Sequence, residues 1–352
     1  EKAIRLEQGL FIEIRDFLSA QISRIQHTAV GLKTLDALVS LAVAAVKNRY
    51  VRPEIADDGV IDIVDGRHPV VEAGMHGDDQ FVPNSTLLDD EDNRMLIITG
   101  PNTGGKTVSL KTLGLLCLMA QCGLHIPAGD RSAVSVFTGI LADIGDEQSI
   151  EQSLSTFSAH MKTIVNILDE ADGDSLVLFD ELSAGTDPVE GAALAIAVIE
   201  HVRARGAKVA ATTHYAELKT FAMTTAGVEN ASCEFDVETL CPTYKLLIGI
   251  PGKSNAFAIS ARLGLDPRVI ETAKQQMDAE SIRFEDVLTQ LEIKRQQLEK
   301  EKEEIDRLHA KQEEDSRRAR EFRAQMERAK ENARSRGEAE AKRILADAKS
   351  AA

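Results

Sequence analysis

Short apolar runs and helix-forming stretches alternate through the middle of the chain. Continuous apolar runs at residues 96–99, 175–179 and 207–214 are typical of strands buried on both faces of a parallel sheet. The stretches 108–121, 146–168 and 189–206 predict helices. This alternation predicts an α/β fold with a mainly parallel sheet and helices on its faces.

Helical patterns also occupy both ends of the chain. Before Pro53, apolar residues recur at helical spacing in two runs separated by Gly31, which predicts two packing helices. After residue 266 nearly all residues are helix formers, and two heptad seams, offset by three residues, run through 284–305 and 308–333. Charged positions in these seams weaken a coiled coil, so a paired helix and a single solvated helix both remain open.

Shorter patterns fill the intervals. Residues 60–64 alternate like a half-buried strand, 67–72 form a turn entering an apolar run, and 73–86 form a loop. Residues 133–145 predict a strand and a loop. Residues 231–250 predict two more strands, and helices follow.

Composition limits the possible partners. The net charge is −16, yet residues from 281 onward carry 18 Lys/Arg and 17 Asp/Glu, so the first 280 residues are strongly acidic. A strongly acidic globular unit is a poor general binder of nucleic-acid phosphates, so any contact with nucleic acid is confined to a local surface. The four cysteines form no C-x-x-C pair and read as reduced, buried thiols of a cytosolic protein, with zinc unlikely. No window comes near the roughly 20 apolar residues that span a bilayer, which predicts no membrane partner.

A phosphate-binding motif follows the run at 96–99. Residues 100–107 match G-x-x-x-x-G-K-[ST], the P-loop pattern, whose glycines let main-chain amides face a phosphate at a helix start. Lys106 would reach the β- and γ-phosphates, and the Thr107 hydroxyl would bind Mg²⁺. The predicted nucleotide-binding residues here are Gly100, Pro101, Asn102, Thr103, Gly104, Gly105, Lys106, Thr107 and Val108.

Two carboxylates end the strand at 175–179. Asp180 suits the Mg²⁺ shell, and Glu181 can orient and polarise an attacking water. A helix cap or a solvated turn would explain the same dipeptide, but the P-loop favours catalysis. His214 ends the next strand, where it would hydrogen-bond the γ-phosphate or stand as an ordinary strand-end histidine.

Three further positions could serve a nucleotide. Phe81 stands alone in its loop and is either a satellite of the core or a residue that stacks on a base. Ser153 and Ser155 open a predicted helix, where hydroxyls and free amides can meet a phosphate.

The motifs follow the order of the ABC-type ATPases, and within that superfamily the chain resembles the MutS family. Thr107-Val108 stands where mismatch-recognising members have Ser-Thr, so the chain looks more like the bacterial MutS-two branch, although Ser183 stands where that branch has Gly. The resemblance covers about residues 54–277 and rests on RHPVVE (67–72), LIITGPNTGGKT (96–107), DIGDEQSIEQSLSTF (143–157), LVLFDELSAGTDP (176–188), ATTHY (211–215) and GIPGKSNAFAI (249–259).

This resemblance implies a role for each motif. Phe81 would stack on adenine, and Gln148 would take the glutamine-loop position. Ser155, with Ser153, would complete the site of the partner subunit. The implied catalytic residues are Glu181, His214 and Lys106, and the implied metal ligands are Thr107 and Asp180.

The resemblance also implies an organisation and a function. A P-loop ATPase domain would occupy 53–265, after a helical segment at 1–52 and before a helical or coiled-coil arm at 266–352. The protein would be a cytoplasmic homodimer that uses ATP and Mg²⁺ to clamp on nucleic acid or ribosomes, in branched-DNA binding, suppression of recombination or ribosome rescue. The full-length protein would also be an endonuclease through a domain outside this chain.

Other ATPase classes fit less well. A coiled-coil clamp of the chromosome-organising type is the main alternative, but it places a very long coiled coil between P-loop and Asp-Glu strand, where this chain has 74 positions. A transporter subunit would carry a Gly-Gly signature where SLSTF stands. A GTPase would carry N-K-x-D, which does not occur.

Overall fold

The structure, a computed structural model, describes residues 1–75, 80–89, 94–145, 156–236, 239, 241–253, 256–276 and 279–350. The chain divides into two compact units, residues 1–275 and 276–352, and each is described by itself.

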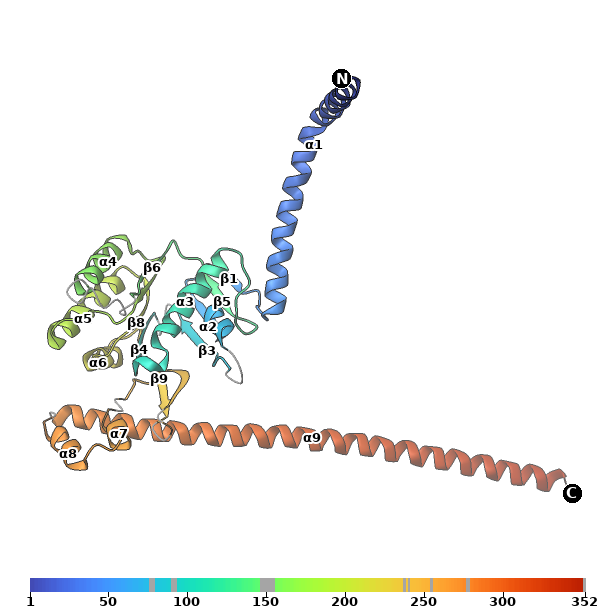
Figure 1. The fold of residues 1–352 in the computed structure, drawn as a ribbon. Coiled ribbons are helices and arrows are strands. Elements are labelled where there is room, and N and C mark those ends of the chain that lie inside the picture. Colours follow the sequence, from blue (N-terminus) through green and yellow to red (C-terminus); the bar gives the residue numbers. More distant parts are fainter. Residues whose placement is uncertain are drawn as a thin grey trace. The chain divides into compact units, whose positions relative to one another are not determined.

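Helices and strands alternate as the sequence predicts (Figure 1). In chain order they are α1 (Lys2–Lys47), β1 (Glu54–Ala56), β2 (Ile61–Gly66), α2 (Pro69–Gly74), β3 (Asn84–Leu88), β4 (Met95–Thr99), the 3₁₀ helix η1 (Asn102–Gly104), α3 (Lys106–Gln121), β5 (Ala133–Ser135), β6 (Gly139–Asp143), α4 (Thr156–Glu170), β7 (Ser175–Phe179), α5 (Pro188–Ala204), β8 (Lys208–Thr212), α6 (Ala216–Thr224), β9 (Val228–Asp236), β10 (Cys241–Ile248), α7 (Ala256–Arg262), α8 (Pro267–Gln275) and α9 (Ala279–Ser350).

A six-stranded sheet organises the first unit. Its strand order is β10-β9-β4-β8-β7-β6, with β10 antiparallel to β9 and the other neighbours parallel. Every residue of β4, β7 and β8 is buried, as expected for strands covered on both faces. The predicted α/β fold with a mainly parallel sheet is therefore confirmed.

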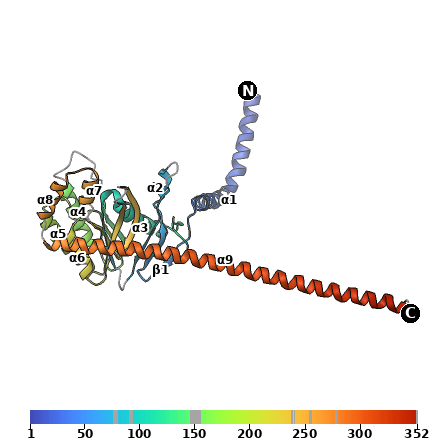
Figure 2. The same ribbon diagram turned by 90° about the horizontal axis from the view of Figure 1, so that it is seen from below.

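Helices cover both faces of this sheet. Leu96 and Ile98 of β4 belong to an apolar cluster with residues of α3, whereas Ile97 between them belongs to a second cluster with α4, α5 and α6. Figures 1 and 2 both show α4, α5 and α6 gathered together, with α3 on the other side of the strands. The period of two along a strand thus divides the core into two layers.

A second sheet, of four strands in the order β1-β5-β2-β3, lies beside α3. Only the central strands of this sheet, β5 and β2, had clear apolar patterns, so residues 84–86 of β3 were wrongly predicted as loop. In the six-stranded sheet, β6 was not separated from the strand and loop predicted over 133–145. Residues 69–74 form a short helix rather than a turn, because Pro69 begins it and the His68 ring accepts a hydrogen bond from the Val71 amide at 3.3 Å.

The two predicted N-terminal helices are one continuous helix, α1. Gly31 lies in its interior, where a glycine costs only about 1 kcal/mol relative to alanine. An 18-residue window of α1 has a mean hydropathy of 1.8, so by length and composition this helix is able to cross a membrane. This finding corrects the expectation that no stretch of the chain comes near the apolar length needed to span a bilayer. Helices that pack against protein also reach this mean hydropathy.

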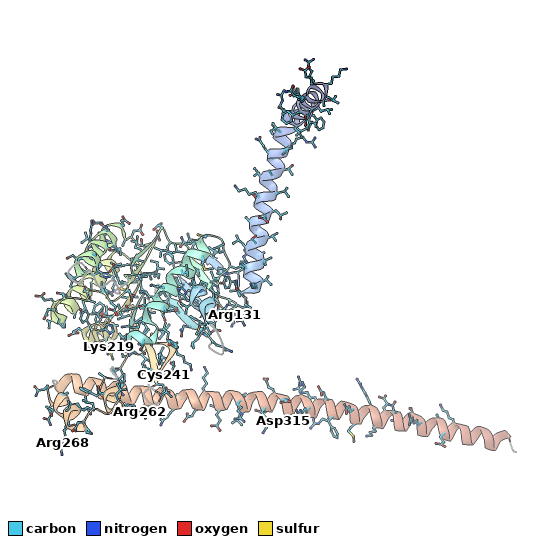
Figure 3. All side chains as sticks on the ribbon, viewed as in Figure 1. Arg131, Lys219, Cys241, Arg262, Arg268 and Asp315 are labelled. Atoms are coloured by element: carbon cyan, nitrogen blue, oxygen red, sulfur yellow. The ribbon has the colours of Figure 1, made fainter. Side chains whose placement is uncertain are left out.

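The cysteines divide into two pairs. Cys117 and Cys233 are buried as predicted, but Cys122 and Cys241 are exposed, which corrects the expectation for half of them. Both exposed thiols lie at element ends: Cys122 follows α3, and Cys241 begins β10, as Figure 3 shows.

The second unit contains α9. Leu298, Ile305 and Phe322 of its predicted seams are exposed in the single chain. The single chain does not test whether α9 is paired or single, the two alternatives that the sequence leaves open.

Candidate active site

The P-loop connects the central strand β4 to α3. Gly100 has φ +127°, and a Cβ there would lie 3.2 Å from the carbonyl oxygen of Cys233. Gly105 caps α3 with φ +93°. Both positions need glycine, and the first turn of α3 presents its free amides at this loop. The structure therefore places the predicted loop at the carboxyl end of the sheet.

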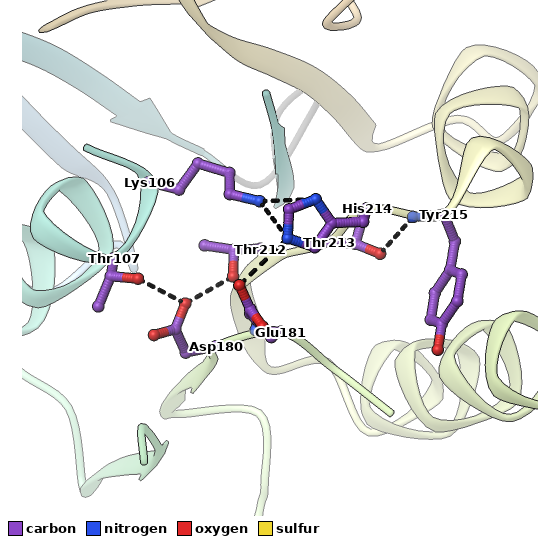
Figure 4. Close-up of polar contacts among 8 residues, drawn as sticks. All are labelled: Lys106, Thr107, Asp180, Glu181, Thr212, Thr213, His214 and Tyr215. Atoms are coloured by element: carbon purple, nitrogen blue, oxygen red, sulfur yellow. Dashed lines mark hydrogen bonds and ion pairs between the residues drawn. The ribbon is translucent and has the colours of Figure 1, made fainter. Parts of the chain in front are cut away.

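Asp180 and Thr107 meet at the carboxyl ends of β7 and β4 (Figure 4). The Thr107 hydroxyl donates a hydrogen bond to Asp180 Oδ1 at 3.1 Å, and the Thr212 hydroxyl donates to the same oxygen at 2.6 Å. Asp180 is 7% exposed. Buried carboxylate and hydroxyl oxygens so close together are suitable ligands for Mg²⁺, so the residues fit the predicted metal.

Glu181, His214 and Lys106 form a second chain of contacts (Figure 4). Glu181 Oε1 lies 3.1 Å from His214 Nε2, and Lys106 Nζ lies 3.0 Å from the same nitrogen and 3.3 Å from Nδ1. Lys106 is nearly fully buried, whereas the side chain of His214 is about half exposed. An imidazole therefore stands between a buried cation and a carboxylate.

The backbone of Glu181 is held in an unusual conformation. Its φ is +50°, in the left-handed region, and its amide donates a hydrogen bond to the Thr212 hydroxyl at 2.8 Å. Thr212 thus links both carboxylate residues, because the same hydroxyl donates to Asp180. Sequence reasoning missed Thr212, because no local pattern in the sequence records its contacts with Asp180 and the Glu181 amide.

A cavity of about 350 Å³ opens beside the P-loop. Phe81, Tyr244, Gly105 and Val108 are among its lining residues. The Asn84 amide fixes the Tyr244 backbone, which has φ +60°, by donating to the Tyr244 carbonyl at 2.9 Å. The structure brings Phe81 to this cavity, and it adds Tyr244, which no motif in the sequence indicated.

Several predicted residues cannot be placed. Gln148, Ser153 and Ser155 lie outside the described residues.

The remaining predicted P-loop residues form a tight turn. Asn102 begins η1 and Thr103 follows within it, after Pro101. Gly104 closes this turn by donating its amide to the Pro101 carbonyl at 3.0 Å.

Comparison with known proteins adds independent information. The family model described as MutS domain V matches residues 96–280. Endonuclease MutS2 of Clostridium botulinum (strain Kyoto / Type A2) is 49% identical over 344 residues, which cover 96% of this chain and 43% of that protein. Endonuclease MutS2 of Agathobacter rectalis is 54% identical over 294 residues, covering 82% and 36%, and that of Lachnospira eligens is 57% identical over 270 residues, covering 77% and 34%. The chain thus spans about two fifths of the length of these relatives.

Proposed function

The chain belongs to the MutS family, in its MutS2 branch, and from this premise we propose that it is the ATP-hydrolysing part of a dimeric machine that clamps on nucleic acid. The observation that carries the proposal is the meeting of P-loop, metal carboxylate, water-orienting carboxylate and histidine at one edge of the sheet. Residues separated by more than 100 positions meet there, as ATP hydrolysis requires.

Each group has a separate task in this mechanism. The P-loop amides and the start of α3 bind the phosphates, and Phe81 and Tyr244 border the cavity for the base. Thr107 and Asp180 would hold Mg²⁺, which when bound neutralises charge on the phosphates. Lys106 turns from His214 toward the β- and γ-phosphates.

Glu181 then orients the attacking water, and its carboxylate polarises the O–H bond. His214 Nε2 lies 3.1 Å from Glu181 Oε1, and in this proposal the imidazole hydrogen-bonds the γ-phosphate. Thr212 holds the Glu181 backbone, so the carboxylate keeps its direction while the phosphate leaves.

The decisive test is Glu181→Gln in the full-length protein. ATP turnover should fall about 100-fold or more, because the amide cannot act as a base, while ATP stays bound. Glu217→Gln is the matched control, since Glu217 is an exposed carboxylate on the adjacent helix α6. Unchanged turnover in the folded Glu181→Gln variant would overturn the assignment.

We further propose that two subunits share each ATP site, with Ser155 serving the partner's nucleotide. Ser155→Ala and Glu181→Gln homodimers should each be inactive, but a mixture should regain about a quarter of normal turnover, because half of the dimers then contain one intact site. A mixture that stays inactive argues for sites complete within one subunit.

The target and location follow from the branch. The relatives are named endonucleases, and we propose that nuclease activity belongs to regions of the full-length protein outside this chain. We propose branched DNA and the RNA of stalled ribosomes as the polymers that a cytoplasmic homodimer would clamp. Binding of the full-length protein to each, at stated salt with and without ATP, distinguishes them.

A further inference from the structure

Asp143 is a buried carboxylate at the end of β6, the edge strand beside β7. It is only 5% exposed. The amide of Asp180 donates a hydrogen bond to the Asp143 carbonyl at 2.9 Å. The backbone that directs the predicted metal carboxylate is therefore joined directly to Asp143.

The Asp143 side chain points to a histidine on another element. His160 of α4 has Nδ1 at 3.0 Å and 2.9 Å from the two carboxylate oxygens. Burial raises the pKa of Asp143, the hydrogen bond and charge of His160 lower it, and the nearby Asp180 raises it again. Burial has the largest effect and the pKa of Asp143 stays raised, so His160 offsets only part of the cost of burying one carboxylate beside another.

The contact between the two elements is tight. A Cβ at Gly145 would lie 2.7 Å from Cε1 of the His160 ring, so the chain leaving β6 runs directly against the imidazole. Nδ1 of His160 lies within hydrogen-bond distance of both oxygens of a buried carboxylate, and this contact ties α4 to the end of β6. The first turns of α4 are thereby held against the end of β6 through His160.

We propose that Asp143 and His160 are positioning residues for ATP hydrolysis, which fix α4 against the backbone that carries Asp180 and Glu181. This inference rests on the proposed ATPase function. Neither residue lines the cavity beside the P-loop. Their loss should therefore affect turnover much more than nucleotide binding.

A purely structural pair would give a different result. Such a pair would contribute to thermal stability, and its removal would lower activity only through loss of folded protein. A positioning pair changes kcat in molecules that are folded and have ATP bound, since small displacements of reacting groups slow reactions steeply.

The test measures kcat and KM for ATP, the Kd of a fluorescent ATP analogue and the melting temperature of the full-length protein. His160→Ala should lower kcat about tenfold and change the Kd less than about threefold. His160→Asn should recover most of the loss, because its amide nitrogen can donate from the position of Nδ1. His201→Ala, an exposed histidine on α5, is the matched control and should keep normal turnover.

Coupling between the pair gives a second criterion. Asp143→Asn with His160→Ala should lower kcat by less than the product of the two single effects, because both substitutions disrupt the same contact. Independent effects would overturn the proposal, and so would normal kcat in folded His160→Ala. If Glu181→Gln abolishes turnover but His160→Ala does not change it, the ATPase assignment stands and the positioning role fails.

Discussion

Ser183→Gly should stabilise the chain. Ser183 lies in the loop after Glu181 with φ +62°, in the left-handed region, and it is only 3% exposed. Its hydroxyl has no hydrogen-bond partner among the described residues. Backbone conformation and burial both disfavour serine at this position, where the resemblance predicted glycine.

The expected gain can be worked out from these two terms. A left-handed conformation costs a residue with a Cβ about 1–2 kcal/mol, and a buried hydroxyl without a partner costs about 1–3 kcal/mol. Glycine loses about 1 kcal/mol through its greater freedom in the unfolded chain. The free energy of unfolding should therefore rise by about 1–4 kcal/mol.

Urea unfolding followed by far-ultraviolet circular dichroism measures this change, since the chain has no tryptophan. Ser183→Ala is the matched control, because it removes the hydroxyl but keeps the Cβ. Both variants keep the hydrogen bond that the Tyr215 hydroxyl donates to the Ser183 carbonyl at 2.9 Å. A Ser183→Gly variant no more stable than Ser183→Ala would refute the backbone term, and one less stable than the parent would refute the reasoning as a whole.

Three further changes test other parts of the structure. Thr212→Val removes the hydroxyl that links the two carboxylate residues, so it should cost about 1–3 kcal/mol in unfolding free energy and slow ATP turnover about tenfold in a steady-state assay. Gly114→Ala places a Cβ of α3 against the Leu178 side chain, and a cost of about 1–3 kcal/mol should outweigh the roughly 1 kcal/mol gained in helix propensity, seen as a lower urea midpoint. Burial raises the pKa of Cys117 to about 12, so mass spectrometry should find alkylation of exposed Cys122 in the native chain and of Cys117 only after unfolding.

The sequence predicted the strands and residues that depend on local chemistry. The apolar runs of β4, β7 and β8 fit only strands buried on both faces of a sheet. The P-loop glycines are required by the backbone conformation of the loop. β3 escaped notice because its buried and exposed positions alternate over only five residues beside a loop. Thr212 and Tyr244 escaped notice because their roles depend on contacts across the fold, which no local pattern records.

Under the proposed function, the contacts of Lys106 would link nucleotide binding to Glu181 through His214. While Lys106 lies against His214, the imidazole is held between a cation and Glu181, and the charges balance locally. Under the proposed function, a triphosphate in the P-loop would attract Lys106 and so withdraw the cation from His214. His214 would then be available to the γ-phosphate. Departure of the phosphate would restore the first arrangement, so the same three side chains would sense the nucleotide and reset the site.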